Sequence, residues 1–232
     1  MSTQFVAMHM SDGIVNAPTS VLFGVIAVIA LGVCGWKART ELDERTVPLA
    51  GLVAAFIFAV QMVNFPILPG VSGHLLGGAL AAILVGPYTG ALCIAIVLIV
   101  QSLLFADGGI SALGMNVINM AVIGVATGYL AAVFSARLCR RTAGLSLRQL
   151  GFVGFIAGLI GTICAAMGFV AEYAIGGASG VALDSVAAYM FATHVLVGVG
   201  EGAITSLTVI AVGKARPDLI YLLRSQPRRV PA

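Results

Sequence analysis

Charged residues are scarce in this sequence. Asp, Glu, Lys and Arg make up 9% of its 232 residues, while 60% are hydrophobic and the mean hydropathy is +1.09. A typical soluble domain has about 25% charged residues, so this composition excludes that class. Apolar stretches recur along the whole chain. We therefore predict that residues 1–232 form one transmembrane domain rather than a soluble domain with a membrane anchor.

Sequence motifs of several enzyme classes are also missing. There is no G-x-x-x-x-G-K-[ST] phosphate loop, so the chain is not expected to hydrolyse ATP itself. The G-x-S-x-G and H-E-x-x-H patterns of hydrolases are absent too. The four cysteines lack C-x-x-C spacing and are predicted to be buried apolar residues, neither paired in disulfides nor bound to metal. We therefore expect neither an enzyme nor a protein with a permanent cofactor.

The apolar stretches predict an all-α, polytopic bundle of seven transmembrane helices. A helix needs about 20 apolar residues to cross the hydrocarbon, within a range of roughly 17 to 25. The candidate spans are 17–36, 47–64, 74–86, 88–106, 113–136, 150–174 and 186–213. The third span is short, and only Gly86-Pro87 separates it from the fourth, so this pair also fits one broken hairpin.

The basic residues predict the orientation of these spans. They follow the first, fifth and seventh spans: Lys37, Arg39 and Arg45; Arg137, Arg140, Arg141 and Arg148; Lys214, Arg216, Arg224, Arg228 and Arg229. With seven spans, all twelve lie on one side, which the positive-inside rule makes cytoplasmic. We therefore expect an external N-terminal segment (1–16), a seven-helix bundle (17–213) and a basic cytoplasmic tail (214–232).

The opposite side is predicted to be acidic. It receives residues 1–16 and the loops near 65–74, 106–109 and 175–185, which contain Asp12, Asp107 and Asp184 but no basic residue. Such a surface would concentrate cations. The basic side would attract anionic lipid.

Two of the three histidines, His9 and His74, fall in polar breaks on this external side. Imidazole is the commonest metal ligand of proteins, although a lone histidine in an external loop is often only solvated. In a chain starting at Met8, the terminal amine, the His9 amide and the His9 imidazole would form fused five- and six-membered chelate rings. His74 would supply a fourth nitrogen. Planar nitrogen ligation suits Ni(II) or Cu(II), constrains Co(II), and is poor for tetrahedral zinc.

The segment that carries His74 is predicted to be an irregular, non-helical loop that dips into the bundle, because it contains Pro66, Pro69 and Gly70. Such backbone is tolerated at membrane depth only where protein or water covers it. Asn116 and Asn119, near the external end of the fifth span, would line the site as supporting residues, and packing between helices explains them equally well.

His194 and Glu201 are seven residues apart in the last span and share a helix face. An ionisable residue at this depth usually faces a cavity or a partner. A proton path is one interpretation. The other is a protonated or hydrogen-bonded glutamate that fixes helix packing.

Several sequence blocks occur in a specific order and spacing. They are Met8-His9-Met10-Ser11-Asp12-Gly13-Ile14-Val15, Gly73-His74-Leu75-Leu76-Gly77-Gly78-Ala79-Leu80, Gly86-Pro87, Leu103-Leu104-Phe105-Ala106-Asp107-Gly108-Gly109 and Ala112-Leu113-Gly114. Their arrangement resembles the CbiM/NikM family, the substrate-specific subunits of energy-coupling-factor cobalt and nickel transporters. Members typically begin at the Met-His pair, whereas seven residues precede Met8 here, so a misassigned start or processing before Met8 is expected.

The resemblance implies a binding site and a set of partners. The implied metal ligands are Met8, His9 and His74. Apart from the resemblance, we expect Asp12, Asp107, Asn116 and Asn119 to be supporting residues around them. The implied partners are a transmembrane coupling (T) subunit, a small accessory membrane subunit and cytoplasmic ABC ATPases, without nucleic acid. The implied setting is a prokaryotic inner membrane, and the transported substrate is Co²⁺ or Ni²⁺ for cobalamin biosynthesis.

The sequence therefore predicts the metal-capturing subunit of an ATP-driven importer. One alternative is a stand-alone, proton-coupled transporter or channel for divalent metal that uses Glu201 and His194. Under that alternative Glu201→Gln abolishes transport, whereas under the importer hypothesis it spares metal binding. A third hypothesis is a purely structural membrane subunit, in which His74→Ala would not change metal binding.

Overall fold

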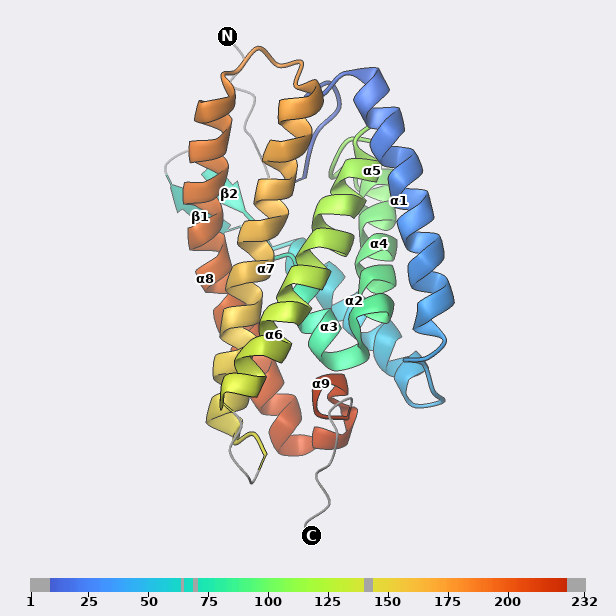
Figure 1. The fold of residues 1–232 in the computed structure, drawn as a ribbon, viewed down its shortest axis with the longest axis vertical. Coiled ribbons are helices and arrows are strands. Elements are labelled where there is room, and N and C mark those ends of the chain that lie inside the picture. The colour runs from blue at the N-terminus through green and yellow to red at the C-terminus, as the bar shows by residue number, and fades with distance from the viewer. Residues whose placement is uncertain (1–8, 64, 69–70, 140–143, 225–232) are drawn as a thin grey trace.

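The computed structural model describes residues 9–63, 65–68, 71–139 and 144–224. Most of this length is helical (Figure 1). The longer helices are α1 (Ala17–Ala38), α2 (Thr46–Gln61), α4 (Pro87–Leu104), α7 (Leu147–Gly176) and α8 (Leu183–Ala215). The shorter elements are α3 (Gly78–Val85), α5 (Leu113–Asn116), the π-helix η1 (Val117–Gly124), α6 (Val125–Cys139), the 3₁₀ turn η2 (Pro217–Leu219) and α9 (Tyr221–Arg224).

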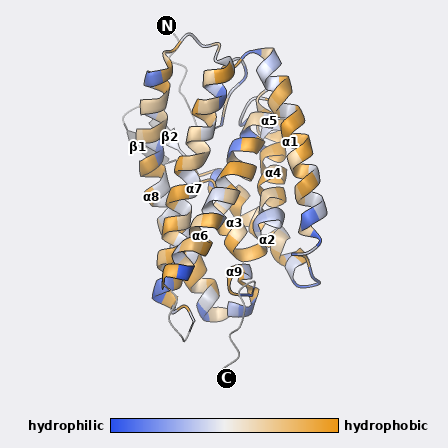
Figure 2. Cartoon of the chain, viewed as in Figure 1, coloured by the Kyte–Doolittle hydropathy of each residue, from blue (hydrophilic) through white to orange (hydrophobic). Residues whose placement is uncertain are grey.

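Five helical stretches are long and apolar enough to cross a membrane: α1, α4, the continuous run Leu113–Cys139, α7 and α8. Each coincides with a predicted span. The helix α2 is also apolar but has only 16 residues. Figure 2 shows hydrophobic residues along most of the length of these helices. The prediction of a helical bundle embedded in a membrane is thus confirmed for these five stretches.

The third predicted span, 74–86, is wrong at its N-terminal side, because α3 begins at Gly78 and has eight residues. At about 1.5 Å per residue, such a helix is too short to cross a hydrocarbon core of roughly 30 Å. Gly77, in the left-handed region with φ +76°, precedes it. Gly86, with φ +102°, ends it, and Pro87 opens α4. The predicted break at Gly86-Pro87 is therefore confirmed.

The segment before α3 is more regular than predicted. The strands β1 (Phe65–Leu68) and β2 (Val71–Gly73) form an antiparallel hairpin, in which Pro66 lies opposite Ser72 at an irregular register. The non-helical character is confirmed, but the expectation of a wholly irregular loop is wrong. Figure 1 shows this hairpin partway along the bundle, beside α8, rather than at its end.

The core is centred on α3, all eight residues of which are buried. Around it, α7 and α8 pack closely, since a Cβ on Gly158 would lie 2.9 Å from the Cα of Gly202. By contrast, α1 is peripheral, and apolar side chains such as Val28 and Trp36 are exposed. Figure 1 places the start of α1 and the α7–α8 connection at one end of the bundle, and the α1–α2 connection and α9 at the other.

Candidate metal-binding site

The N-terminal segment 9–16 is held against the bundle by Asn116, the last residue of α5. The Asn116 Oδ1 accepts a hydrogen bond from the Met10 amide at 2.8 Å, and its Nδ2 donates to the Met10 carbonyl at 3.1 Å. The Gly109 amide also donates to the Met10 carbonyl, at 3.0 Å. The Met10 side chain is fully buried. The segment is therefore an integral part of the fold, and the anchoring of Met10 also fixes the main chain of its neighbour, His9.

Asp12 ties the same segment to the connection between α4 and α5. Its Oδ1 accepts from the Ser111 amide at 2.8 Å and from the Ser111 hydroxyl. The hydroxyl contact is the largest cause that lowers the pKa of Asp12. The approach is close, because a Cβ on Gly109 would lie 2.4 Å from the Asp12 nitrogen.

The His9 side chain is buried and faces the α4–α5 connection. Its Nδ1 lies 2.9 Å from the Oδ1 of Asp107. This hydrogen bond is the first cause that lowers the pKa of Asp107, so the carboxylate stays ionised beside the imidazole. A carboxylate can only accept, so Nδ1 donates and the lone pair of His9 lies on Nε2.

His74 follows β2 and is buried too. Its Nδ1 donates to the Leu75 carbonyl at 2.9 Å, which again leaves the lone pair on Nε2. The two imidazole rings are 4.5 Å apart between centroids and inclined by 38°. Neither Nε2 has a hydrogen-bond partner, although both atoms are buried. An unpaired buried nitrogen is costly, so two of them side by side indicate a ligand that binds both.

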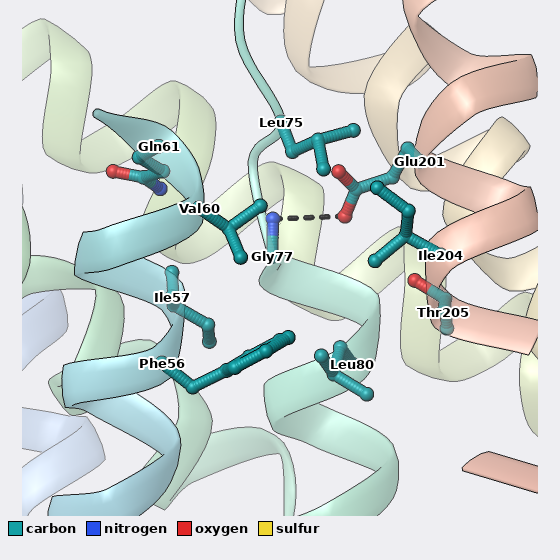
Figure 3. A pocket seen from close by; sticks show the side chains of 10 residues that line it. All are labelled: Phe56, Ile57, Val60, Gln61, Leu75, Gly77, Leu80, Glu201, Ile204 and Thr205. Carbon is teal, nitrogen blue, oxygen red and sulfur yellow. Dashed lines mark hydrogen bonds between the residues drawn. The ribbon is translucent and has the colours of Figure 1, made fainter. Parts of the chain in front are cut away.

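The main chain next to His74 is held by side chains from two helices. Glu201, buried in α8, accepts hydrogen bonds from the Leu76 and Gly77 amides, both at 2.8 Å. Gln61, the last residue of α2, donates from Nε2 to the Leu76 carbonyl at 2.6 Å. Figure 3 shows Gln61 and Glu201 on opposite sides of this segment. We define residues 74–77 as the ligand segment.

The structure brings together most of the predicted site residues. His9, His74, Asp107, Asn116 and Asp12 belong to one connected group. Met8 lies outside the described residues. Within the part of the chain that the structure describes, no group of three or more His, Cys, Asp and Glu side chains is arranged to hold a metal.

Asn119 is placed differently. It lies in η1, and its Nδ2 donates to Glu172 Oε2 of α7 at 2.6 Å. Glu172 was not among the predicted site residues, although, like Glu201, it is an ionisable residue inside a predicted span. Gln61 and Ser111 were also missed. As for His194, its Nδ1 lies 2.6 Å from the Met190 carbonyl of the preceding helical turn.

Known proteins of similar sequence and structure handle transition metals. Residues 9–219 match the family described as CbiM, cobalt uptake substrate-specific transmembrane region. A putative fused nickel transport protein NikMN of Archaeoglobus fulgidus is 42% identical over 92% of this chain and 68% of its own length. The cobalt transport protein CbiM of Geobacter sulfurreducens is 33% identical over 92% of this chain and 62% of its own length. A crystal structure of a truncated transition metal transporter has a TM-score of 0.77 and 27% identity, and the match covers 89% of this chain and 99% of that one.

Proposed function

We propose that this chain, which belongs to the CbiM family of cobalt-uptake substrate-specific transmembrane regions, is the metal-binding membrane subunit of an ATP-driven importer of the energy-coupling-factor type. The transported substrate is Co²⁺ or Ni²⁺. The observation that supports this most strongly is the pair of buried imidazoles, His9 and His74, whose ring centroids lie 4.5 Å apart.

The proposed ligands are His9, His74 and Met8. The Met8 ligand requires a chain in which Met8 is the first residue, because only then does it carry a free amine. Closing the six-membered chelate ring uses the Nδ1 of His9, so metal binding by this route exchanges the hydrogen bond to Asp107 for a metal bond. The Asp107 carboxylate remains nearby, and its negative charge favours a cation there. Asp12 and Asn116 support the site by fixing residues 10–12 against the bundle.

The donor set fits both Co²⁺ and Ni²⁺. Imidazole nitrogen suits several divalent transition metals, and selectivity among them follows from geometry and availability. A planar arrangement of nitrogen atoms would disfavour zinc, which prefers a tetrahedron. The names of the relatives include both cobalt and nickel transport proteins.

The proposed topology has seven membrane-inserted helical segments, with the N-terminus outside and the C-terminus inside. Its support is that the basic residues Lys37, Arg39, Arg45 and Arg224 belong to the end of the bundle with the α1–α2 connection and α9, away from the start of α1. The metal site then opens to the exterior.

The proposed partners follow from the family and from the lack of a phosphate loop. They are a transmembrane coupling subunit, a small accessory membrane subunit and cytoplasmic ABC ATPases in a prokaryotic cell membrane. Imported cobalt would serve cobalamin biosynthesis. ATP hydrolysis by the partners would supply the energy for metal movement.

The alternative of a proton path through Glu201 and His194 receives less support. Each oxygen of Glu201 accepts a main-chain hydrogen bond at 2.8 Å, which is the geometry of a structural carboxylate. The geometry also changes one expectation of the importer hypothesis, because a residue that holds the ligand segment is not expected to be neutral for metal binding.

Calorimetric titration with Ni²⁺ and Co²⁺ tests the proposal. The protein should have an N-terminus at Met8 verified by intact mass, and should be compared with a form that keeps residues 1–7. We expect one metal ion per chain, weaker binding by the longer form, and loss of binding in His9→Ala and His74→Ala. Unchanged binding by both alanine variants would refute the proposed site.

A further inference from the structure

The ligand segment has main-chain groups that its own helix does not satisfy. The first amides of any α-helix lack intrahelical acceptors, and Leu76 and Gly77 directly precede α3. In the described structure these two amides donate to the two oxygens of Glu201. Glu201 is separated from them by more than a hundred residues of sequence and comes from α8. The carboxyl group therefore holds the main chain that leads into α3 from another helix.

We propose that Glu201 is the positioning residue of the metal site: its carboxylate fixes the ligand segment, and with it the place of the His74 imidazole relative to His9. This inference rests on the proposed function, because it assumes that His74 is a metal ligand. It assigns to Glu201 a role in metal affinity and coordination geometry, without direct contact with the metal.

The carboxylate is well suited to this role. Each of the two oxygens of Glu201 accepts a main-chain hydrogen bond, and the side chain is only 3% exposed. Leu76, whose amide it binds, is itself 2% exposed. Both the donor and the acceptor of this hydrogen bond are thus buried, and water does not compete for it.

The second anchor strengthens the argument. Leu76 is held through its amide by Glu201 of α8 and through its carbonyl by Gln61 of α2. The segment also packs tightly on α2, since a Cβ on Gly77 would lie 2.7 Å from the Ile57 side chain. Two helices therefore determine the position of a residue that is two positions from His74.

Metal sites are sensitive to such anchoring. Metal–ligand distances must hold within about 0.2 Å, and loss of a supporting hydrogen bond typically weakens metal affinity about 10- to 100-fold. A glutamine at position 201 has a single acceptor oxygen, and its NH₂ group would face a main-chain N–H. It would therefore release one of the two amides and repel it.

The test compares Glu201→Gln with Thr205→Val in protein that starts at Met8. Thr205 lies one turn further along α8 and is 1% exposed. Together with Glu201 and Gly77 it lines a small cavity (Figure 3). Ni²⁺ affinity is measured by calorimetry, ligand geometry by the visible absorption bands of bound Ni²⁺, and stability by thermal unfolding of the metal-free protein. We expect Glu201→Gln to bind Ni²⁺ about 10- to 100-fold more weakly with altered bands, and Thr205→Val to keep wild-type affinity and bands.

Equal loss in both variants, or wild-type affinity and bands in Glu201→Gln, would overturn the inference. If Glu201→Gln does not fold, Gln61→Leu removes the other anchor of Leu76 and should also weaken binding and alter the bands; wild-type behaviour there would count against positioning. The variant His74→Ala distinguishes failure of the proposed function from failure of the inference about Glu201. Binding that survives His74→Ala overturns the proposed function, whereas binding lost in His74→Ala but intact in Glu201→Gln overturns the inference alone.

Discussion

Two turns flank α3, and each is anchored by a buried glutamate from elsewhere in the chain. Before α3, Glu201 accepts hydrogen bonds from the Leu76 and Gly77 amides. After α3, at the start of α4, Glu41 accepts from the Tyr88 and Thr89 amides at 3.2 and 2.7 Å. Both turns are thus fixed by a glutamate that accepts hydrogen bonds from two consecutive main-chain amides.

The surroundings of the two turns differ. The Glu201 turn adjoins the paired imidazoles with unpaired Nε2 atoms. The Glu41 turn lies at the end that carries the α1–α2 connection, and a Cβ on Gly86 would lie 2.5 Å from the Glu41 carboxyl carbon. A carboxylate anchor is therefore a general structural solution in this fold. The histidines are what make one of the two turns a candidate binding site.

The largest effect on the site, apart from loss of its ligands, is expected from Asn116→Leu. This change removes both hydrogen bonds to Met10 and leaves its amide and carbonyl buried without these partners, which releases the segment that carries His9. We expect metal affinity to fall about tenfold or more, measured by calorimetry. Asn119→Leu, one turn away on the same helical run, is the control; it should lower stability while keeping affinity. Equal loss of affinity in both variants would argue against a specific role of Asn116.

Glu41→Gln sharpens the contrast between the two turns. It disturbs the start of α4 in the way that Glu201→Gln disturbs the segment before α3, so stability should fall by about 1–3 kcal/mol for a buried group left without its partner. Metal affinity should not change, because the turn is remote from the imidazoles. Thermal unfolding and calorimetry on the same samples measure both quantities. A loss of affinity as large as that of Glu201→Gln would show that the two turns are not independent.

A smaller effect concerns pH. Burial raises the pKa of Glu41 above its ordinary value of 4.5. The folded state then holds this proton more tightly than the unfolded state, so the contribution of Glu41 to stability is largest at low pH and declines as pH rises through the interval above 4.5. Melting temperatures measured across this interval should decline less steeply in Glu41→Gln than in the wild type. Parallel curves of melting temperature against pH in the two proteins would contradict the raised pKa of Glu41.

The smallest effect is expected from Arg224→Ala. The Arg224 guanidinium lies 3.4 Å from the Asp43 carboxylate, and both groups are partly or largely exposed to solvent. Exposed ion pairs contribute little to stability, so melting temperature and metal affinity should both match the wild type. A marked loss of stability would mean that α9 is held chiefly by this pair rather than by the buried side chains of Leu222 and of Ile220, which directly precedes α9.

The sequence predicted the features that depend on local patterns. Apolar runs located the long helices, Gly86-Pro87 located a break, and the polar loops containing His9 and His74 suggested a shared site. The hydrogen bonds of Glu201 to Leu76 and Gly77 could not be predicted from the sequence, because they join residues 125 and 124 positions apart. The shortness of α3 was missed for the same reason: residues 74–77 are apolar enough for a helix, and long-range side chains hold them in another conformation.

The Glu172–Asn119 pair and the π-helix η1 were not predicted either. A π-helical run has no distinct apolar period that separates it from an α-helix over eight residues. Glu172 was detectable as a charge inside a span, but its partner was not, since the bond joins residues 53 positions apart.

The most direct measurement is an anomalous difference map from crystals of Ni²⁺-loaded protein whose N-terminus is Met8. The proposed site predicts one peak per chain, at about 2 Å from an imidazole nitrogen of His9 and one of His74. The same map shows whether His9 uses Nδ1, with Asp107 displaced, or Nε2. A peak at another place, such as beside Glu172 and Asn119, with none between the two histidines, would contradict the assignment of the metal site.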